Sequence, residues 1–96
     1  MQIVFNPLFE EALWDILVYI GLESESASRR FEETLFTHLE HLAHFPYQYR
    51  KSIYYQNNDI RDCIFKGYTI PYLIDEKRGV IVILDIFKWI EKKKKE

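Results

Sequence analysis

The stretch IRDCIFKGYTIPYLIDEKRGVIVILDIFK, residues 60–88, carries the pattern that determines the fold. Apolar and polar residues alternate with a period of two, which is typical of β-strands because successive side chains point to opposite faces of a sheet. Two short turns divide the stretch, and strands joined by such turns pair in antiparallel fashion. The stretch therefore predicts an antiparallel meander with strands at 60–65, 68–74 and 80–87 and turns at 66–67 and 76–79.

Residues on either side of this stretch extend or modify the predicted sheet. Residues 53–56 read as one more strand, followed by a turn at 57–59. Pro71 has no amide proton to donate, so its strand is predicted to lie at an edge or to contain a bulge. The last strand is almost unbroken Val, Ile and Leu, as expected for a central strand buried on both faces.

The first half of the chain has helical periodicity. Asn6 and Pro7 give a capping residue and a proline at the first helical position. One apolar stripe runs as far as Gly21, and a second begins at Ala27 and is ended by Pro46. The stripes consist of Phe9, Ala12, Leu13, Ile16 and Ile20, then Ala27, Phe31, Leu35, Leu39 and Leu42. We therefore predict an α+β domain in which an N-terminal strand at 2–5 precedes an antiparallel helix hairpin. The hairpin covers one face of a three- to four-stranded antiparallel meander and leaves the other face open.

Length and composition favour one small cytoplasmic domain. The 96 residues suffice for a single core, and we expect a domain at 1–91 with a lysine-rich, solvated tail at 92–96. The single cysteine, Cys63, cannot form an internal disulfide and is expected to be a small core residue in a reducing compartment. We find neither a signal peptide nor a run long enough to span a membrane.

Charge is divided unevenly along the chain. Residues 1–45 carry eight acidic side chains against Arg29 and Arg30, a balance of −6, whereas residues 46–96 carry eleven Lys or Arg against seven acids, a balance of +4. The two halves therefore present different fields to partners. The net charge of −2 argues against a nucleic-acid-binding domain, which usually shows a clear basic excess.

No side-chain constellation identifies a metal, cofactor or catalytic site. His38, His41 and His44 follow one another at a spacing of three, which turns them around a helix, so we expect titratable residues on a solvated side and no metal site. The serines lie outside any Gly-x-Ser-x-Gly motif, and no glycine-rich phosphate loop is present. The aspartates of the predicted sheet are expected to be solvated charges; they are Asp62, Asp75 and Asp85.

Arg61 is the unusual residue of the meander. Regular alternation puts it on one face with Cys63 and Phe65, while Ile60, Asp62 and Ile64 share the other face. There it has the length to pair with a carboxylate, to stack on a tyrosine, or to bind a partner. The competing interpretation is structural: an arginine in a half-exposed strand commonly bridges strands or satisfies the preceding loop.

Several short motifs resemble the RelE/ParE superfamily of bacterial type II toxins. They are IRD at 60–62, GYTIPY at 67–72 and the strand at 80–86, together with ALWDI at 12–16, Arg30-Phe31 and LAHFPYQYR at 42–50. The similarity covers nearly the whole chain. It implies a toxin neutralised by a cognate antitoxin whose C-terminal segment wraps the toxin. It leaves a homodimer and a toxin–antitoxin heterotetramer open as assemblies.

The superfamily contains two activities, and the resemblance favours one of them. RelE-like members cleave mRNA in the ribosome, and their pattern has an arginine after the Gly-Tyr pair and another after a lysine beyond the last strand. Here those places hold Thr69 and Trp89, and Lys88 keeps the lysine. The resemblance thus implies a ParE-like inhibitor of DNA gyrase that acts by protein binding and lacks a catalytic residue. The alternatives are a ribosome-dependent mRNA endonuclease and a degenerate, non-toxic module that only binds an antitoxin.

The candidate partner-binding residues form a predicted positive recognition patch. They are Arg61, Lys66, Tyr68, Lys88 and Trp89. Charge and exposed ring surface suffice for recognition, whereas RNA cleavage also requires a proton acceptor and convergent cations.

Overall fold

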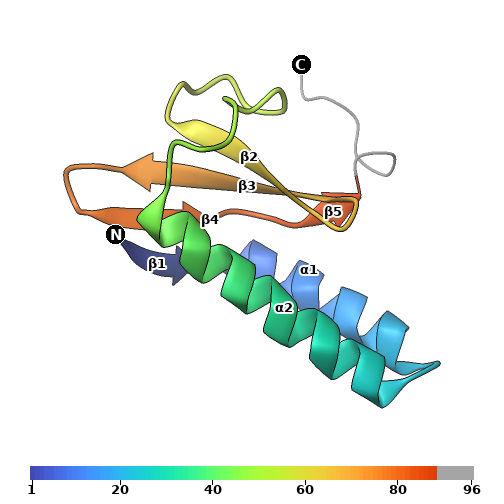
Figure 1. Cartoon of the computed structure of the whole chain (residues 1–96). Helices are drawn as coiled ribbons and strands as arrows, with labels where there is room; N and C mark the ends of the chain where they lie inside the picture. The colour runs from blue at the N-terminus through green and yellow to red at the C-terminus, as the bar shows by residue number, and fades with distance from the viewer. Residues whose placement is uncertain (89–96) are drawn as a thin grey trace.

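The computed structural model describes residues 1–88, and its elements follow the predicted α+β order (Figure 1). The elements are β1 (Gln2–Phe5), α1 (Pro7–Gly21), α2 (Glu25–His44), β2 (Ile60–Phe65), β3 (Tyr68–Asp75), β4 (Val80–Ile83) and β5 (Phe87–Lys88). The helix pair lies on one face of the sheet (Figure 1). The predicted tail at 92–96 and the boundary at residue 91 lie outside the described residues, so that division stays a prediction.

Both helices begin at the capping residues that the sequence provides. The Asn6 side chain accepts a hydrogen bond from the Leu8 amide at 2.8 Å, and the Ser24 hydroxyl accepts one from the Ala27 amide at 3.1 Å. Each cap satisfies an amide that has no partner inside its helix, which typically contributes about 1 kcal/mol. Fixed starting points hold the two apolar stripes in register with the sheet.

The core lies between the helix pair and the sheet. The predicted stripe of α2 is buried there from Phe31 onward, and Phe9 and Leu13 bring α1 into the same cluster. Cys63 is fully buried in this core, as predicted, and Phe65 lies beside it on the same face of β2. The assignment of alternate residues of β2 to opposite faces is therefore confirmed.

The sheet is mixed, with strand order β1-β4-β3-β2. The meander β2-β3-β4 is antiparallel, as predicted, whereas β1 runs parallel to β4, with Gln2 opposite Val80. β4 is a central strand because β1 covers its outer side. The intervening helices make this parallel pairing feasible, since a parallel neighbour requires a long crossover.

The predicted strand at 80–87 is interrupted. It divides into β4 and β5, and β5 pairs with the start of β3. Tyr72 pairs with Ile83, and Thr69 pairs with Phe87. Three residue steps along β3 therefore correspond to four steps along the segment that joins β4 to β5. The extra residue is a bulge, and it lies opposite Pro71, which cannot donate to the ladder. Neither alternative for the strand of Pro71 is correct: β3 is central, and the extra residue lies in the segment that faces it.

The predicted strand at 53–56 is wrong, and so is the prediction of a fully open second face. The chain forms one bridge with β2, between Lys51 and Arg61, flanked by backbone bonds from Ser52 to Ile60 and from Asp62 to Arg50. It then turns over the face opposite the helices. Side chains replace the ladder here: the Tyr54 amide donates to the Ser52 hydroxyl at 3.1 Å. Tyr54 itself is buried against the sheet. We call residues 51–59 the strap. Nearer β1 the second face stays uncovered.

Neither helix of the described part of the chain, residues 1–88, has the length and apolar character needed to cross a membrane.

Candidate functional site

The hairpin between β2 and β3 brings three predicted site residues to one end of the sheet. Lys66 and Gly67 form its two-residue turn with positive φ angles of 48° and 83°, a backbone shape that suits a tight hairpin. Tyr68 follows the turn and pairs with Lys88 of β5. The Lys88 ammonium lies 5.6 Å from the centroid of the Tyr68 ring, and that of Lys66 lies 5.7 Å from the Phe65 ring. Both distances allow cation–π attraction.

A hollow of about 430 Å³ opens between α1 and this end of the sheet. Its lining carries two charged side chains, Asp15 of α1 and Lys88 of β5. The rings of Tyr19 and Tyr68 add two phenols to a lining that also includes the Phe87 ring. Charge of both signs beside aromatic surface is suited to binding a mixed polar and apolar partner group. We call this hollow the β5 hollow.

Arg61 lies at the other end of β2, away from the β5 hollow. It pairs with Tyr72, whereas Phe65 pairs with Tyr68, so four residues at about 3.3 Å each separate the two places by roughly 13 Å. Its guanidinium donates to the Tyr49 carbonyl at 2.6 Å. The structure thus brings Lys66, Tyr68 and Lys88 together and leaves Arg61 apart.

The environment of Arg61 is that of a structural residue. Its guanidinium carbon lies 4.9 Å from the centroid of the Tyr47 ring, and the side chain is half-buried. Tyr47 in turn donates its hydroxyl to a carboxylate oxygen of Glu76, and this bond raises the pKa of the Tyr47 phenol. The bond from Arg61 to the preceding loop is the contact that the structural interpretation expected, and the contact with the Tyr47 ring is the tyrosine stacking that the sequence also allowed.

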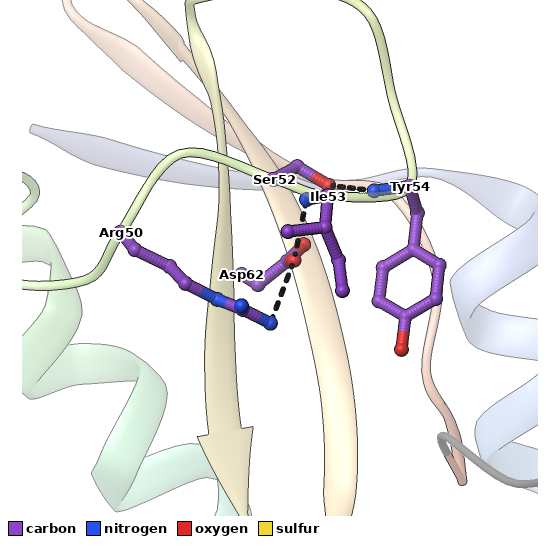
Figure 2. A network of polar contacts seen from close by, with 5 residues as sticks. All are labelled: Arg50, Ser52, Ile53, Tyr54 and Asp62. Carbon is purple, nitrogen blue, oxygen red and sulfur yellow. Dashed lines mark hydrogen bonds and ion pairs between the residues drawn. The ribbon is translucent and has the colours of Figure 1, made fainter. Parts of the chain in front are cut away.

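A buried carboxylate holds the strap (Figure 2). Asp62 is fully buried, and its Oδ2 accepts a hydrogen bond from the Ile53 amide at 3.1 Å. The same oxygen lies 3.6 Å from Nη2 of Arg50, whose side chain is 54% exposed. Oδ1 has no hydrogen-bond partner among residues 1–88. Since the ion pair is half-open to water, the bond to the Ile53 amide is the more important anchor.

The prediction that all three sheet aspartates are solvated is wrong for two of them. Asp62 lies under the strap, and Asp85 is buried within the bulge, where its Oδ1 accepts a hydrogen bond from the Ile86 amide at 2.8 Å. Asp75 is part-exposed and lies 3.7 Å from Arg78. Burial of Asp62 and Asp85 follows from the strap and the bulge, which alternation in the sequence does not reveal.

The histidines do not form a metal site in the described part of the chain, since residues 1–88 contain no cluster of three potential ligands. His41 packs on Phe45, with ring centroids 5.0 Å apart. His38 is half-buried rather than solvated, because its Nε2 lies 3.0 Å from the Tyr49 hydroxyl and its ring packs on Phe65. The expectation of a fully solvated histidine face is therefore wrong at His38.

Burial raises the pKa of two further groups in this region, the Cys63 thiol and the Tyr49 phenol. It raises the pKa of the Cys63 thiol from 9.0 to about 11. The pKa of Tyr49 is raised to about 12, first by burial and then by the neighbouring Cys63. Cys63 is consequently a neutral thiol at physiological pH, which fits a core residue and not a nucleophile.

RelE-like members carry arginine at two positions, and only one of these positions lies within the described residues. Thr69 is 3% exposed and pairs with Phe87 across β3 and β5. Trp89, the other place and the fifth predicted site residue, lies outside the described residues. Asp15 and Tyr19 were not identified from the sequence, because nothing in a helical pattern indicates which strand end it will face.

Comparison with protein families identifies the family to which the chain belongs. Residues 3–88 match the profile of a family described as the ParE toxin of the type II toxin–antitoxin system parDE. The chain belongs to this family. The match extends from β1 through β5 and confirms the ParE-like branch of the RelE/ParE superfamily that the sequence motifs indicated. Membership of the ParE toxin family makes the chain a toxin of a type II system. A search of curated proteins gave no match.

Replacement of Arg61 tests its structural assignment. We expect Arg61→Ala to lower the free energy of unfolding by about 1–3 kcal/mol, because the Tyr49 carbonyl loses a charged donor and the Tyr47 ring loses its stacked cation. Lys88→Ala, at an exposed position, should change it by less than about 0.5 kcal/mol. Urea denaturation of both variants measures the difference. Equally small changes in the free energy of unfolding of the two variants would contradict a structural role for Arg61.

The raised pKa of Cys63 predicts a loss of stability at alkaline pH. The folded protein favours the neutral thiol, so this contribution is complete below the ordinary pKa of 9.0 and is lost as the pH rises toward about 11. We expect the free energy of unfolding, measured by urea denaturation on either side of pH 9, to fall more steeply with rising pH for the native chain than for Cys63→Ala. Equal slopes in the two proteins would contradict burial of the thiol.

Proposed function

We propose that this ParE-family toxin inhibits DNA gyrase by binding it as a protein, and that a cognate antitoxin neutralises it. The observation that carries the proposal is the burial of Thr69. RelE-like members have an arginine at this place, whereas here a short side chain faces the strap and has no charge to stabilise a phosphorane. Family membership supports the same reading.

The end of the sheet around the β5 hollow is the surface proposed to meet the target. Lys66 and Lys88 are exposed there, and Tyr68 lies between them in the structure. Arg61 is not part of this surface, since its guanidinium is engaged by the loop after α2. Cations over aromatic rings are common at the centre of protein interfaces. The proposed place of action is the cytoplasm, where gyrase meets DNA.

The part of the proposal that concerns the antitoxin is supported by the uncovered region of the second face. Val4 on β1 is 45% exposed, and Leu73 and Val82 beside it are half-buried. These side chains belong to adjacent strands, so they give one apolar surface that the strap does not reach. A monomer rarely leaves such a surface to water without a partner. Whether the pair forms a heterotetramer or the toxin a homodimer stays a prediction.

The alternative activity, ribosome-dependent cleavage of mRNA, is favoured by one observation. Asp15 lines the same hollow as Lys88 and Tyr68, so a carboxylate, an ammonium and a phenol share one cavity. A carboxylate in this position is the kind of proton acceptor that attack by a ribose 2′-hydroxyl requires. The two activities therefore make opposite demands on Asp15.

Expression in cells with two readouts separates the activities. We expect the chain to change the topology of a reporter plasmid while mRNA on translating ribosomes stays intact. Lys88→Ala should weaken the topological effect about tenfold, because one central cation of an interface is typically worth 1–2 kcal/mol. Asp15→Asn should leave mRNA intact as before.

Lys77→Ala provides the matched control, since Lys77 is exposed in the turn at the opposite end of β3. It should keep full activity. Codon-phased cleavage that disappears in Asp15→Asn would reverse the assignment in favour of the endonuclease. A chain that still binds the antitoxin when expressed but does not inhibit growth would instead be a degenerate antitoxin-binding module.

A further inference from the structure

The strap reaches the proposed target surface through an aromatic contact. The Tyr54 ring packs edge to face on the ring of Phe87 in β5, with 5.1 Å between the ring centroids. Tyr54 is 6% exposed, so its side chain is buried between the strap and the sheet. We propose that Tyr54 is a positioning residue, whose ring holds Phe87 and thereby keeps the neighbouring Lys88 in place to bind the target. This role rests on the gyrase function proposed above.

β5 is a short strand that needs side-chain contacts to keep its place. In the described part of the chain it pairs with β3 through two residues, Phe87 with Thr69 and Lys88 with Tyr68. The bulge separates these pairs from the four residue pairs between β4 and β3. Two pairs alone contribute little against the entropy lost in ordering the backbone. Packing of the side chains therefore determines how firmly β5 stays on the sheet.

The two side chains of β5 are held from opposite faces of the sheet. Paired residues point to the same face, so Phe87 lies with Thr69 on the face that the strap covers. Lys88 lies with Tyr68 on the other face, where the Tyr68 ring meets Phe31 of α2 edge to face at 5.6 Å between ring centroids. β5 is thus held between the helix layer and the strap.

The position of Tyr54 is set by the bonds that anchor the strap (Figure 2). The Ile53 amide donates to Asp62, and the Tyr54 amide donates to the Ser52 hydroxyl. These bonds fix the backbone at Tyr54 and immediately before it, which places the ring against Phe87. A hollow of about 270 Å³ lies beside Tyr54. Because that side is open, a shorter side chain would leave Phe87 with fewer contacts.

Lys88 is the residue through which Tyr54 acts. Its ammonium lies 5.6 Å from the centroid of the Tyr68 ring, at an exposed position. An interface gains affinity when its anchors already occupy their bound positions, because less conformational entropy is lost on binding. Loss of the Tyr54 ring keeps the charge of Lys88 but removes its fixed position. A purely structural Tyr54 would instead affect stability and leave the geometry of Lys88 unchanged.

The first measurement locates Lys88 in the isolated full-length chain by NMR. The ring current of Tyr68 should shift the ε-methylene protons of Lys88 upfield, with nuclear Overhauser effects between the two side chains. We expect Tyr54→Leu, which keeps apolar volume without the ring, to lose both signals. Phe87→Leu removes the same contact from the other side and should give the same result.

Two variants provide the controls for this measurement. Tyr54→Phe keeps the ring and should retain both signals of Lys88. Ile53→Ala changes the adjacent strap residue, whose side chain is 43% exposed, and should retain them as well. Urea denaturation shows that each variant compared is folded.

The second measurement is inhibition of purified gyrase in a plasmid-supercoiling assay. Tyr54→Leu should raise the inhibitory concentration about tenfold, as expected for Lys88→Ala, and Tyr54→Phe should restore it. Since a positioning residue acts through Lys88, the double variant Tyr54→Leu with Lys88→Ala should be no weaker than Lys88→Ala alone. Independent structural damage would instead add to the effect of Lys88→Ala.

Three results would overturn the role of Tyr54. One is an unchanged pair of Lys88 signals in folded Tyr54→Leu and Phe87→Leu. Another is full inhibition by Tyr54→Leu, and the third is an additive loss of inhibition in the double variant. A native chain that does not inhibit gyrase would refute the proposed function instead. The NMR comparison would then still decide whether Tyr54 positions Lys88.

Discussion

Two hydrogen bonds from the sheet to the backbone that follows α2 fix the layout of the molecule. The buried Tyr72 hydroxyl donates to the Pro46 carbonyl at 2.6 Å, and the Arg61 guanidinium donates to the Tyr49 carbonyl at the same distance. Buried carbonyls without partners are costly, so these donors determine where the chain can leave the helix layer. The strap continues from that point, and it covers the second face only because it begins beside β2.

This constraint separates two groups of cations. Arg61 donates to the Tyr49 carbonyl in the loop after α2, and Arg50 pairs with the Asp62 carboxylate beneath the strap. Lys66 and Lys88 lie at the end of β3 away from Arg61, over aromatic rings and open to water. The proposed target surface uses the second group. The uneven charge of the sequence thus becomes a separation of surfaces in space.

Sequence alone predicts the parts of this fold that depend on local chemistry. The helices follow from capping residues and apolar stripes, and the hairpin follows from the turn at 66–67. The missing amide of Pro71 predicts an interrupted ladder at this point, although the extra residue lies in the facing segment and not in β3. Failures occur where a distant contact overrides a local pattern. Residues 53–56 alternate like a strand, yet the carboxylate of Asp62 takes the Ile53 amide and turns the chain aside. Arg61 could be placed on the correct face but not paired with a carbonyl twelve residues away.

Amide hydrogen exchange along the strap tests the central claim, which is that beyond the single bridge at Lys51 the Asp62 side chain holds this segment without further strand pairing. The Ser52 amide donates to the Ile60 carbonyl at 2.8 Å and the Ile53 amide to Asp62. Both amides should exchange as slowly as those of β2, while the exposed Asn58 amide exchanges freely. Exchange of Ile53 at the rate of Asn58, with Ser52 and β2 still protected, would contradict the account.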